Sequence, residues 1–376
     1  MSARPLRILF ATPRFFPAQG GVENHVYQVA RRLAQRGHEP SVFTTDDDGA
    51  LPPHDSVEGV RILRFRAYPA RSDLLLSPQL HRAIQAERAR FDLLHLQNYL
   101  TLVSPAAMHA AKRTQLPYVV TFHGGGHSQS WRNAIRGLQG RMLRQLLLHA
   151  DRLIATARFE VDYYGQRLDL PRKNFAYVSN GCDIAVRTVD VPLADPPLIV
   201  SIGRLEKYKG HHRVLQAFAT LLTQEPRARL RLLGDGPYKP ELEEMARGLG
   251  VADKVEIGGL PLAERQRMAE TLSSASLVTL LSEFETQPMA ALEAIALGRP
   301  VLVADTSGLS ELAQQGYAHA VPLDASPATL AGAMIALMRA PKSRQAIRLP
   351  TWDDCTDGLI ELYRDVLERH KTRGSV

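Results

Sequence analysis

The sequence predicts an α/β protein with two doubly wound domains, each built on a mainly parallel sheet. Short apolar runs alternate with segments of helical spacing along almost the whole chain, as expected for repeated βαβ units. A proline-rich stretch over residues 184–197 interrupts this alternation, and a second series of strands begins after it. The length of 376 residues also suits two domains of ordinary size.

The composition is that of a soluble globular protein, with 45% hydrophobic and 23% charged residues. The only cysteines are Cys182 and Cys355, which excludes a disulfide framework and favours a reducing compartment. The first residues contain too short an apolar run for a signal peptide, and no apolar stretch is long enough to span a bilayer. We therefore expect a cytoplasmic protein.

The net charge of +7 is distributed unevenly along the chain. Residues 1–190 contain 25 Lys and Arg against 16 Asp and Glu, a net charge of +9, whereas the remainder has a net charge of −2. A basic N-terminal half can bind an acidic substrate, an anionic lipid or a nucleic acid. An arginine-rich solvated surface is the alternative explanation.

The first domain begins with a buried strand over residues 6–11 and a loop that ends in Gly20 and Gly21. A helix over residues 22–35 follows, because apolar side chains recur there at steps of three and four, and the next strand covers residues 41–45. Glycines at a helix start let backbone N–H groups approach a phosphate, although such a pair is more often only a tight turn. The chain contains no GxGxxG fingerprint for a dinucleotide.

An acidic run, Asp46 to Asp48, follows the second strand. A glycine and two prolines come within a few positions of it. We therefore interpret the run as a solvated turn and not as a metal site.

The alternation of strands and helices continues up to residue 178. The predicted strands cover residues 60–65, 92–96, 118–122, 152–156 and 175–178. The predicted helices cover residues 74–90, 104–113 and 131–148.

His123 and three glycines directly follow the strand at residues 118–122. A histidine at the carboxyl end of a parallel strand faces the ligand crevice of such a sheet. An HGGG sequence also forms the oxyanion hole of some esterases, but those enzymes need a GxSxG nucleophile elbow. The chain has no GxSxG sequence, so we discount a hydrolase.

The helix at residues 131–148 is basic and amphipathic. Its apolar side chains recur at three- and four-residue steps, and four arginines fall largely between them. The apolar positions are Trp131, Ile135, Leu138, Met142 and Leu146. Contact with an anionic membrane surface is one interpretation, and a helix packed on its sheet with an exposed arginine face is the other.

The second domain repeats the strand and helix alternation. Its predicted strands cover residues 198–202, 229–233, 255–257, 277–281, 300–304 and 320–322. Its predicted helices cover residues 211–222, 238–249 and 328–338, with a helix starting near 289 and a terminal one at 358–370.

Two cations, Arg204 and Lys209, lie in a glycine-bounded loop after the first strand of this domain. Such a loop suits a diphosphate, particularly a departing one whose charge grows in the transition state. Gly234 begins a tight turn after the next strand, and Gly258 lies in a turn open enough for a flat base to stack on the backbone.

Two carboxylates, Glu285 and Glu293, lie eight positions apart around a predicted helix start at Pro288. Glu285 falls in the loop that precedes the helix, and Glu293 falls inside the helix near its positive end. A helix carboxylate can accept hydrogen bonds from a ribose diol, a loop carboxylate can do so from hexose hydroxyls, and the helix start suits the diphosphate between them. For this glutamate pair alone, there is a simpler explanation. Glu285 would be a loop carboxylate that interacts favourably with the helix dipole, and Glu293 would be a helix residue that faces solvent.

Taken in series, these motifs resemble those of family-4 retaining glycosyltransferases. The resemblance is carried by Gly20-Gly21-Val22-Glu23, Arg36-Gly37-His38, His123, Asn180-Gly181-Cys182-Asp183, Gly203-Arg204-Leu205 with Lys209-Gly210, Gly234-Asp235-Gly236-Pro237 and the pair Glu285 and Glu293. It implies a glycosyltransferase B-type fold, in which two Rossmann-like domains face each other across a cleft. Residues 1–185 would bind the acceptor, residues 186–356 would bind the nucleotide-sugar, and a terminal helix at 357–376 would pack back on the first domain.

The resemblance also implies roles for individual residues. Glu293 would hold the ribose, Glu285 the donor sugar, and Arg204 and Lys209 the diphosphate. His123 would lie by the donor sugar and steady charge there, so the expected catalytic residues are His123, Arg204, Lys209 and Glu285. The other expected donor-binding residues are Gly20, Gly21, Gly234, Gly258, Thr286, Gln287, Met289 and Glu293.

The sequence departs from the family pattern after the first glutamate. The family usually has EGFG there, whereas this chain has Glu285-Thr286-Gln287-Pro288. Pro288 removes one N–H donor from the helix start, so phosphate contacts must come from Thr286, Gln287, Met289 or Ala290.

The activity implied is retaining transfer of a hexose or N-acetylhexosamine, by front-face attack without a protein nucleophile, metal or cofactor. The nucleotide-sugar, UDP- or GDP-linked, would be a substrate. The acceptor would be a glycan, a glycolipid or a small molecule, at the inner membrane face if the basic half contacts lipid.

Two alternative functions remain open. The first is a nucleotide-sugar epimerase or phosphorylase of the same fold, and the second, less favoured, is a non-catalytic sugar- or nucleic-acid-binding protein. We expect no nucleic acid, because the two glutamates would repel its phosphates.

Overall fold

The structure is a computed structural model that describes residues 4–18, 20–46, 48–69, 75–124, 130–182, 191–260, 264–340 and 350–374. The chain divides into two compact units. The first unit comprises Met1–Gly124, Trp131–Gly181 and Pro350–Val376, and the second comprises Gly125–Ser130 and Cys182–Leu349. Residues 183–190, which include the first half of the expected linker, lie outside the described residues.

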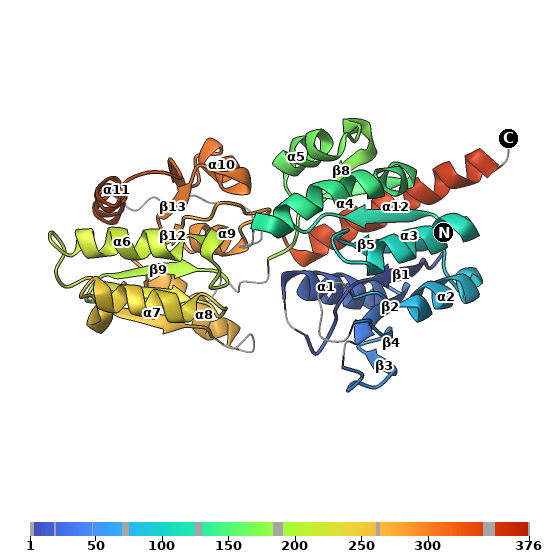
Figure 1. The fold of residues 1–376 in the computed structure, drawn as a ribbon, viewed down its shortest axis with the longest axis horizontal. Coiled ribbons are helices and arrows are strands. Elements are labelled where there is room, and N and C mark those ends of the chain that lie inside the picture. The colour runs from blue at the N-terminus through green and yellow to red at the C-terminus, as the bar shows by residue number, and fades with distance from the viewer. Residues whose placement is uncertain are drawn as a thin grey trace. The chain divides into compact units, whose positions relative to one another are not determined.

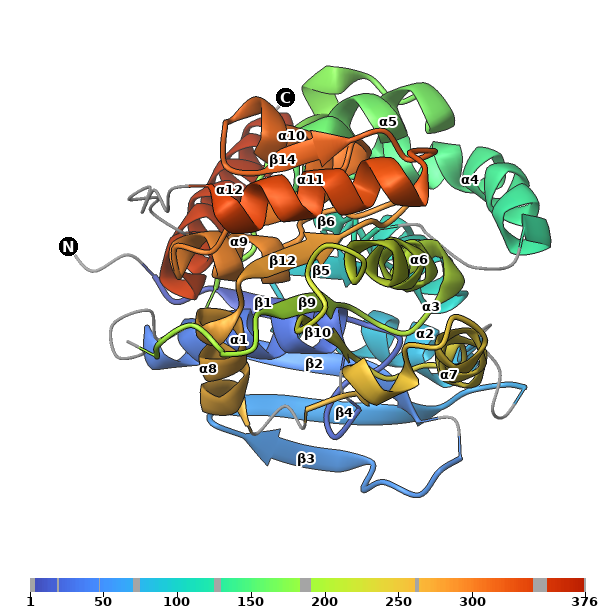
Figure 2. The same ribbon diagram turned by 90° about the vertical axis from the view of Figure 1, so that its left-hand side faces the viewer.

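The first unit contains an eight-stranded sheet in the order β3-β4-β2-β1-β5-β6-β7-β8. All pairs are parallel except β3 with β4, and Figure 2 shows these two at one edge of the sheet. The strands are β1 (Arg7–Ala11), β2 (Glu39–Asp46), β3 (His54–Val57), β4 (Val60–Arg66), β5 (Leu93–Gln97), β6 (Tyr118–Thr121), β7 (Arg152–Ala155) and β8 (Phe175–Tyr177). The order reverses between β1 and β5, so the topological switch point of this sheet lies at their carboxyl ends.

Helices cover both faces of the first sheet (Figure 1). They are α1 (Gly21–Gln35), α2 (Pro78–Ala86), α3 (Val103–Thr114), α4 (Ser130–His149), α5 (Arg158–Leu168) and α12 (Trp352–Gly374), with short 3-10 turns at Arg88–Arg90 and Arg172–Asn174. One buried cluster joins the sheet to α1 and α12, and another joins it to α2, α3, α4 and α5. This two-sided packing is the doubly wound arrangement that the sequence predicted.

The second unit contains a six-stranded, fully parallel sheet in the order β11-β10-β9-β12-β13-β14. Its strands are β9 (Leu198–Ile202), β10 (Arg229–Leu233), β11 (Val255–Gly258), β12 (Leu277–Leu280), β13 (Val301–Ala304) and β14 (His319–Val321). Numbered within the unit, this is the 3-2-1-4-5-6 order of a Rossmann sheet, with its switch point between β9 and β12. A single buried cluster fills both faces.

The helices of the second unit alternate with its strands. They are α6 (His211–Leu221), α7 (Lys239–Gly248), α8 (Arg265–Ser274), α9 (Met289–Ala296), α10 (Ser307–Gln314) and α11 (Pro327–Arg339), with 3-10 turns at Lys207–Lys209 and Ala252–Lys254. Gly298, with a φ of +71°, follows the end of α9.

Several expectations about the first unit were wrong in detail. Strand β3 was not predicted, because its side chains are mostly exposed and it pairs only with β4. Met142, which we expected on the apolar face of α4, is 74% exposed, whereas Leu146 packs against the core together with the buried Leu143 and Leu147. The side chains of Trp131, Ile135 and Leu138, the other expected apolar positions, lie outside the described residues. Asp46 is no solvated turn residue either, because it ends β2, is buried, and accepts a hydrogen bond from the Leu51 N–H at 2.9 Å.

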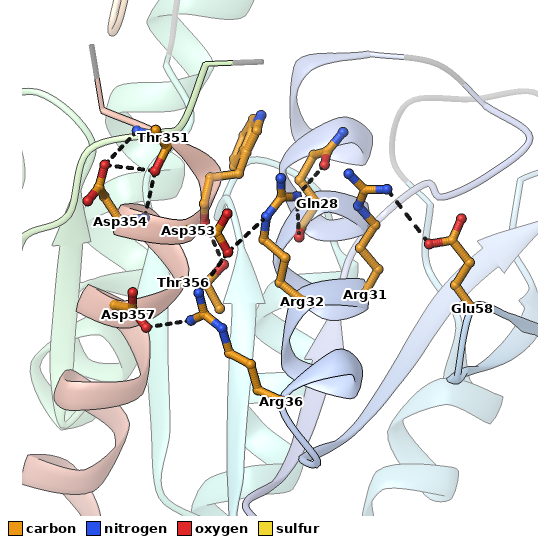
Figure 3. Close-up of polar contacts among 11 residues, drawn as sticks. Gln28, Arg31, Arg32, Arg36, Glu58, Thr351, Asp353, Asp354, Thr356 and Asp357 are labelled. Carbon is orange, nitrogen blue, oxygen red and sulfur yellow. Dashed lines mark hydrogen bonds and ion pairs between the residues drawn. The ribbon is translucent and has the colours of Figure 1, made fainter. Parts of the chain in front are cut away.

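The terminal helix α12 is held against α1 by ion pairs as well as by apolar packing. The Arg36 guanidinium lies 2.6 Å from Asp357 and 2.8 Å from Asp353, and Arg32 lies 3.5 Å from Asp353 (Figure 3). Helix α12 is therefore part of the first unit, and this unit begins again at Pro350, earlier than residue 357 where we expected it.

Candidate active site

Lys209 and Glu285 form an ion pair at the switch point of the second sheet. Lys209 ends the loop after β9, and Glu285 lies in the loop after β12. The Lys209 Nζ donates to Glu285 Oε1 at 2.7 Å, and both side chains are about 85% buried, with 15% and 14% of their surface exposed. Because neighbouring parallel strands end at the same sheet edge, two residues that are 76 positions apart in sequence meet there.

Two serines fix the position of Glu285. The Ser282 hydroxyl donates to the same Oε1 at 2.8 Å, and the Glu285 backbone N–H donates to the Ser307 hydroxyl at 2.8 Å. The Gly308 N–H in turn donates to the Glu285 carbonyl at 3.0 Å. The loop after β12 is thus bound to the start of α10, which leaves the carboxylate little freedom to turn away.

The environment of Lys209 keeps it charged. Burial lowers the pKa of its ammonium group, but the Glu285 carboxylate and the Tyr208 ring outweigh this effect, so the pKa lies above its ordinary value. The Lys209 Nζ also lies 5.2 Å from the centre of the Tyr208 ring. An ammonium group carries three N–H donors, so one can bind Glu285 while others bind a phosphate.

Arg204, on the same loop, is held much more loosely. Its side chain is 72% exposed, and its closest described acid is Glu206 at 3.4 Å. An exposed guanidinium can reorient toward an anion at small cost, in contrast to the buried Lys209.

Glu293 lies in the middle of α9, not near its start as we expected, and is 95% buried. The Cys182 thiol donates to Glu293 Oε1 at 3.7 Å, which connects α9 to the segment where the second unit begins. The other expected donor-binding residues of this region, Thr286, Gln287 and Met289, are half-buried. Gly308 lies directly against the Thr286 carbonyl, so this part of the loop also rests on α10.

Glycines bring the loops of the second unit close together. Gly210 has a φ of +74°, and a Cβ atom added there would overlap the Leu281 carbonyl oxygen at the end of β12. A Cβ atom at Gly234 would overlap the Gly203 carbonyl oxygen. Gly258, by contrast, has open space where a Cβ atom would point, as a stacking surface requires.

Gly20 and Gly21 lie at the start of α1, in the first unit. Gly20 is the extended residue before the helix, and the Asn24 N–H donates to its carbonyl at 3.0 Å. The Glu23 carboxylate lies close to Gly20, so this helix start presents negative charge beside its free N–H groups. Gly21 is exposed and has no atom within 4 Å of an added Cβ.

His123 follows β6, also in the first unit, and hydrogen-bonds to the end of β5. Its Nε2 lies 2.6 Å from Gln97 Oε1, and its ring centre lies 4.8 Å from that of His25. Burial lowers the pKa of His123 well below its ordinary value, and the neighbouring His25 and His95 lower it further. The imidazole is therefore neutral at neutral pH.

The comparisons with known proteins agree with this geometry. The family described as "Glycosyltransferase Family 4" matches residues 19–186, and the one described as "Glycosyl transferases group 1" matches residues 189–349. Together these matches cover most of the described part of both units. The chain belongs to family 4 of the glycosyltransferases.

Relatives of this glycosyltransferase match it over nearly its whole length. A D-inositol 3-phosphate glycosyltransferase from Xylanimonas cellulosilytica is 28% identical over 94% of both chains. The enzyme of the same name from Acidothermus cellulolyticus is 29% identical, over 94% of this chain and 87% of its own.

Solved structures show the same fold. A sucrose-phosphate synthase from Thermosynechococcus elongatus has a TM-score of 0.72 at 18% identity, over 96% of this chain and all of its own. The Anabaena protein Alr3699/HepE in complex with UDP-glucose has a TM-score of 0.68 at 18% identity, over 99% of this chain and all of its own. The glycosyltransferase therefore has the B-type fold, with two Rossmann-like units.

Four residues that contact the predicted site of the glycosyltransferase were not identified from the sequence. Ser282 and Ser307 hold Glu285, while Gln97 and His25 contact His123. Ser307 is the first residue of α10, next to Gly308, and Gln97 is the last residue of β5. Their partners are distant in sequence, however, and no spacing rule connects them.

Neither a metal site nor a membrane span is evident in what the structure describes of the glycosyltransferase. No three His, Cys, Asp or Glu side chains of the described segments come together to hold an ion. None of the described helices combines the length and the apolar character needed to cross a membrane.

Proposed function

We propose that the enzyme transfers a hexose or N-acetylhexosamine from a UDP- or GDP-linked sugar to an acceptor hydroxyl with retention of configuration. The observation that carries this proposal is the Lys209–Glu285 ion pair, which lies on the same loops as the exposed Arg204. A buried cation, an exposed cation and a fixed carboxylate are the groups that a sugar diphosphate needs: cations for the phosphates and an acceptor for the hydroxyls.

In the proposed reaction, the bond between the anomeric carbon and the diphosphate oxygen breaks while the acceptor hydroxyl attacks from the same face. The acceptor proton passes to the departing phosphate oxygen, so no protein base is needed. Lys209 and Arg204 stabilise the charge that grows on the diphosphate, and this stabilisation exceeds what they give the ground state. Glu285 orients the sugar, Glu293 holds the ribose, and residues 286–289 line the phosphates.

The acceptor proposed is a hydroxyl of a glycan, a glycolipid or a small molecule. The relatives named for D-inositol 3-phosphate favour a phosphorylated polyol among these, and the net charge of +9 over residues 1–190 is compatible with an anionic acceptor. We propose a cytoplasmic enzyme, at the inner membrane face if its acceptor is a lipid. We expect no metal or cofactor, so transfer should persist in excess EDTA.

A donor and acceptor screen tests the proposal. Purified enzyme is incubated with UDP-glucose, UDP-N-acetylglucosamine or GDP-mannose, and with D-inositol 3-phosphate, a glycolipid extract or no acceptor. We expect acceptor-dependent release of one nucleotide, and a product whose anomeric configuration by NMR equals that of the donor. An inverted product would exclude the retaining mechanism.

The main alternative is a nucleotide-sugar epimerase or phosphorylase of the same fold. An epimerase would change the donor sugar with no acceptor present, and a phosphorylase would need inorganic phosphate. The same screen, repeated with phosphate, separates these outcomes. Binding of all three nucleotide-sugars without turnover would instead indicate the third alternative, a sugar-binding protein.

A further inference from the structure

Three consecutive residues at the start of α10 hold the loop after β12. The Thr306 hydroxyl donates to the Ser282 carbonyl at 2.8 Å, and the Ser307 hydroxyl accepts from the Glu285 N–H at 2.8 Å. The Gly308 N–H donates to the Glu285 carbonyl at 3.0 Å. Both backbone groups of Glu285 are therefore bound to the start of α10, separately from its carboxylate.

The backbone of Ser307 has a left-handed conformation, with a φ of +46°. A side chain disfavours this region, which glycine enters freely. Gln115 and Asp169 have similar φ values, but they follow the ends of α3 and α5, where left-handed residues are common. Ser307 instead begins a helix, so the helix itself gives no reason for this conformation. Strain of this kind persists only where the surrounding structure holds it, and it often occurs at functional sites.

The hydroxyl of Ser307 gives a physical reason for a residue other than glycine at this position. Its hydrogen bond with Glu285 is the only one that this hydroxyl makes within the described segments. A backbone N–H can only donate, so the hydroxyl is the acceptor. Glycine would relieve the backbone strain but would leave the Glu285 N–H without this acceptor. Alanine would remove the acceptor and keep the strain.

We propose that Ser307 is a positioning residue for Glu285, and that its strained backbone is retained because its hydroxyl holds the Glu285 backbone where the carboxylate meets Lys209. Ser307 acts through Glu285 and is not a catalytic residue. All three residues belong to the second unit, so the positioning is a property of the free protein. Its effect on turnover rests on the proposed function.

Hydrogen exchange of the Glu285 amide, followed by NMR, tests the positioning without any ligand. We expect this amide to exchange at least about 10-fold faster in Ser307→Ala and in Ser307→Gly, because both variants lack the acceptor. The matched control is Ser310→Ala, which removes a hydroxyl of α10 that donates to Asp305 at 2.7 Å and should leave the exchange unchanged. A Glu285 amide that exchanges at the same rate in all these proteins would overturn the proposal.

Urea unfolding of the same two variants tests the backbone strain. Ser307→Gly should unfold at a higher urea concentration than Ser307→Ala, because both lack the hydroxyl and only glycine adopts the positive φ freely. Gln115→Gly and Gln115→Ala, at an exposed residue with a φ of +53°, should show the same order and calibrate the difference. Equal midpoints for the two Ser307 variants, with the expected order at Gln115, would show that Ser307 is not strained.

Activity separates positioning from a purely structural role. We expect kcat/KM for the donor selected by the screen to fall about 10-fold in both Ser307 variants, although their stabilities differ, and to stay unchanged in Ser310→Ala. Activity that returns in Ser307→Gly would assign the effect to stability and not to the hydroxyl. If no nucleotide-sugar is turned over by any protein while amide exchange and unfolding change as expected, the proposed function fails and the positioning of Glu285 stands.

Discussion

At the scale of single residues, the two cations of the candidate site differ in how they are held. Lys209 is buried and paired, so its position is set before any ligand arrives. Arg204 is exposed, so in the proposed reaction it could reorient with the departing diphosphate. A fixed charge stabilises a transition state without reorganisation, whereas a mobile one mainly helps binding and release. The two residues should therefore affect different kinetic constants.

Substitution of Lys209 tests this difference. If Lys209 has the proposed role, Lys209→Ala should lower kcat about 100- to 1,000-fold, because it removes a pre-oriented charge beside the proposed leaving group. It also leaves the Glu285 carboxylate without its cation. Lys207→Ala, at an exposed lysine of the same loop, is the matched control and should leave kcat unchanged. Near-normal kcat in a folded Lys209→Ala protein would remove Lys209 from the proposed site.

Arg204→Ala should raise KM for the donor more than it lowers kcat, since its side chain is exposed in the free protein. Steady-state kinetics at several donor concentrations separate the two constants. A loss confined to kcat would show that Arg204 is as well ordered in the working enzyme as Lys209.

At the scale of elements, the loops after β9 and β12 depend on a backbone contact that only glycine permits. Gly210 combines a positive φ with direct contact to the Leu281 carbonyl, four residues before Glu285. Any side chain there must push the loop that carries Glu285 away from Lys209. Gly250 has a similar positive φ of +69°, but no atom lies within 4 Å of a Cβ added there.

Gly210→Ala and Gly250→Ala form a matched pair for this reason. Gly250→Ala should cost about 1–2 kcal/mol of unfolding free energy from the left-handed backbone alone. Gly210→Ala should cost roughly 1–3 kcal/mol more, and it should also reduce activity. Urea unfolding and donor turnover measure both effects. Equal stabilities of the two variants would show that the contact with Leu281 can relax.

The contact between α1 and α12 is partly electrostatic and should respond to salt. Arg36→Ala removes two ion pairs in a network whose arginine is 74% buried, and we expect a loss of about 1 kcal/mol at low salt that shrinks at high salt. Arg227→Ala breaks one pair with Asp195 that is exposed on both sides, and should change the unfolding free energy little. A loss for Arg36→Ala that is independent of salt would assign the effect to packing.

The sequence predicted most elements because apolar periodicity marks a buried face directly. It predicted both sheets and the terminal helix, and it placed Lys209 and Glu285 on loops that the structure brings within hydrogen-bonding distance. It missed β3, whose side chains are exposed, and the charged helix α5, whose apolar spacing is weak. It could not find Ser282, Ser307 or Gln97 as partners, because such contacts arise only from the order of strands in the sheet.

At the scale of the whole molecule, each unit contains buried histidines that are neutral when folded. In the first unit, burial lowers the pKa of His25 to about 4, although its hydrogen bond to Asn180 opposes this. In the second unit, burial lowers the pKa of His211 to about 4 in the same way. His95 and His123 are also shifted well below their ordinary pKa. The two units therefore share one sensitivity to acid.

Stability should fall as the pH is lowered from about 6.5 toward 4. In that window the unfolded chain binds protons at these histidines and the folded chain does not, so the free energy of unfolding decreases with falling pH. Each pKa shift from 6.5 to about 4 corresponds to roughly 3 kcal/mol of unfolding free energy once the pH is below both values.

Urea unfolding at pH 7.5, 6 and 5 measures the slope of the unfolding free energy against pH. His25→Gln and His211→Gln should each reduce it, whereas His319→Gln, at an exposed histidine, should not. An unfolding free energy that stays constant from pH 7.5 to 5 would mean that these histidines gain protons without opening the fold.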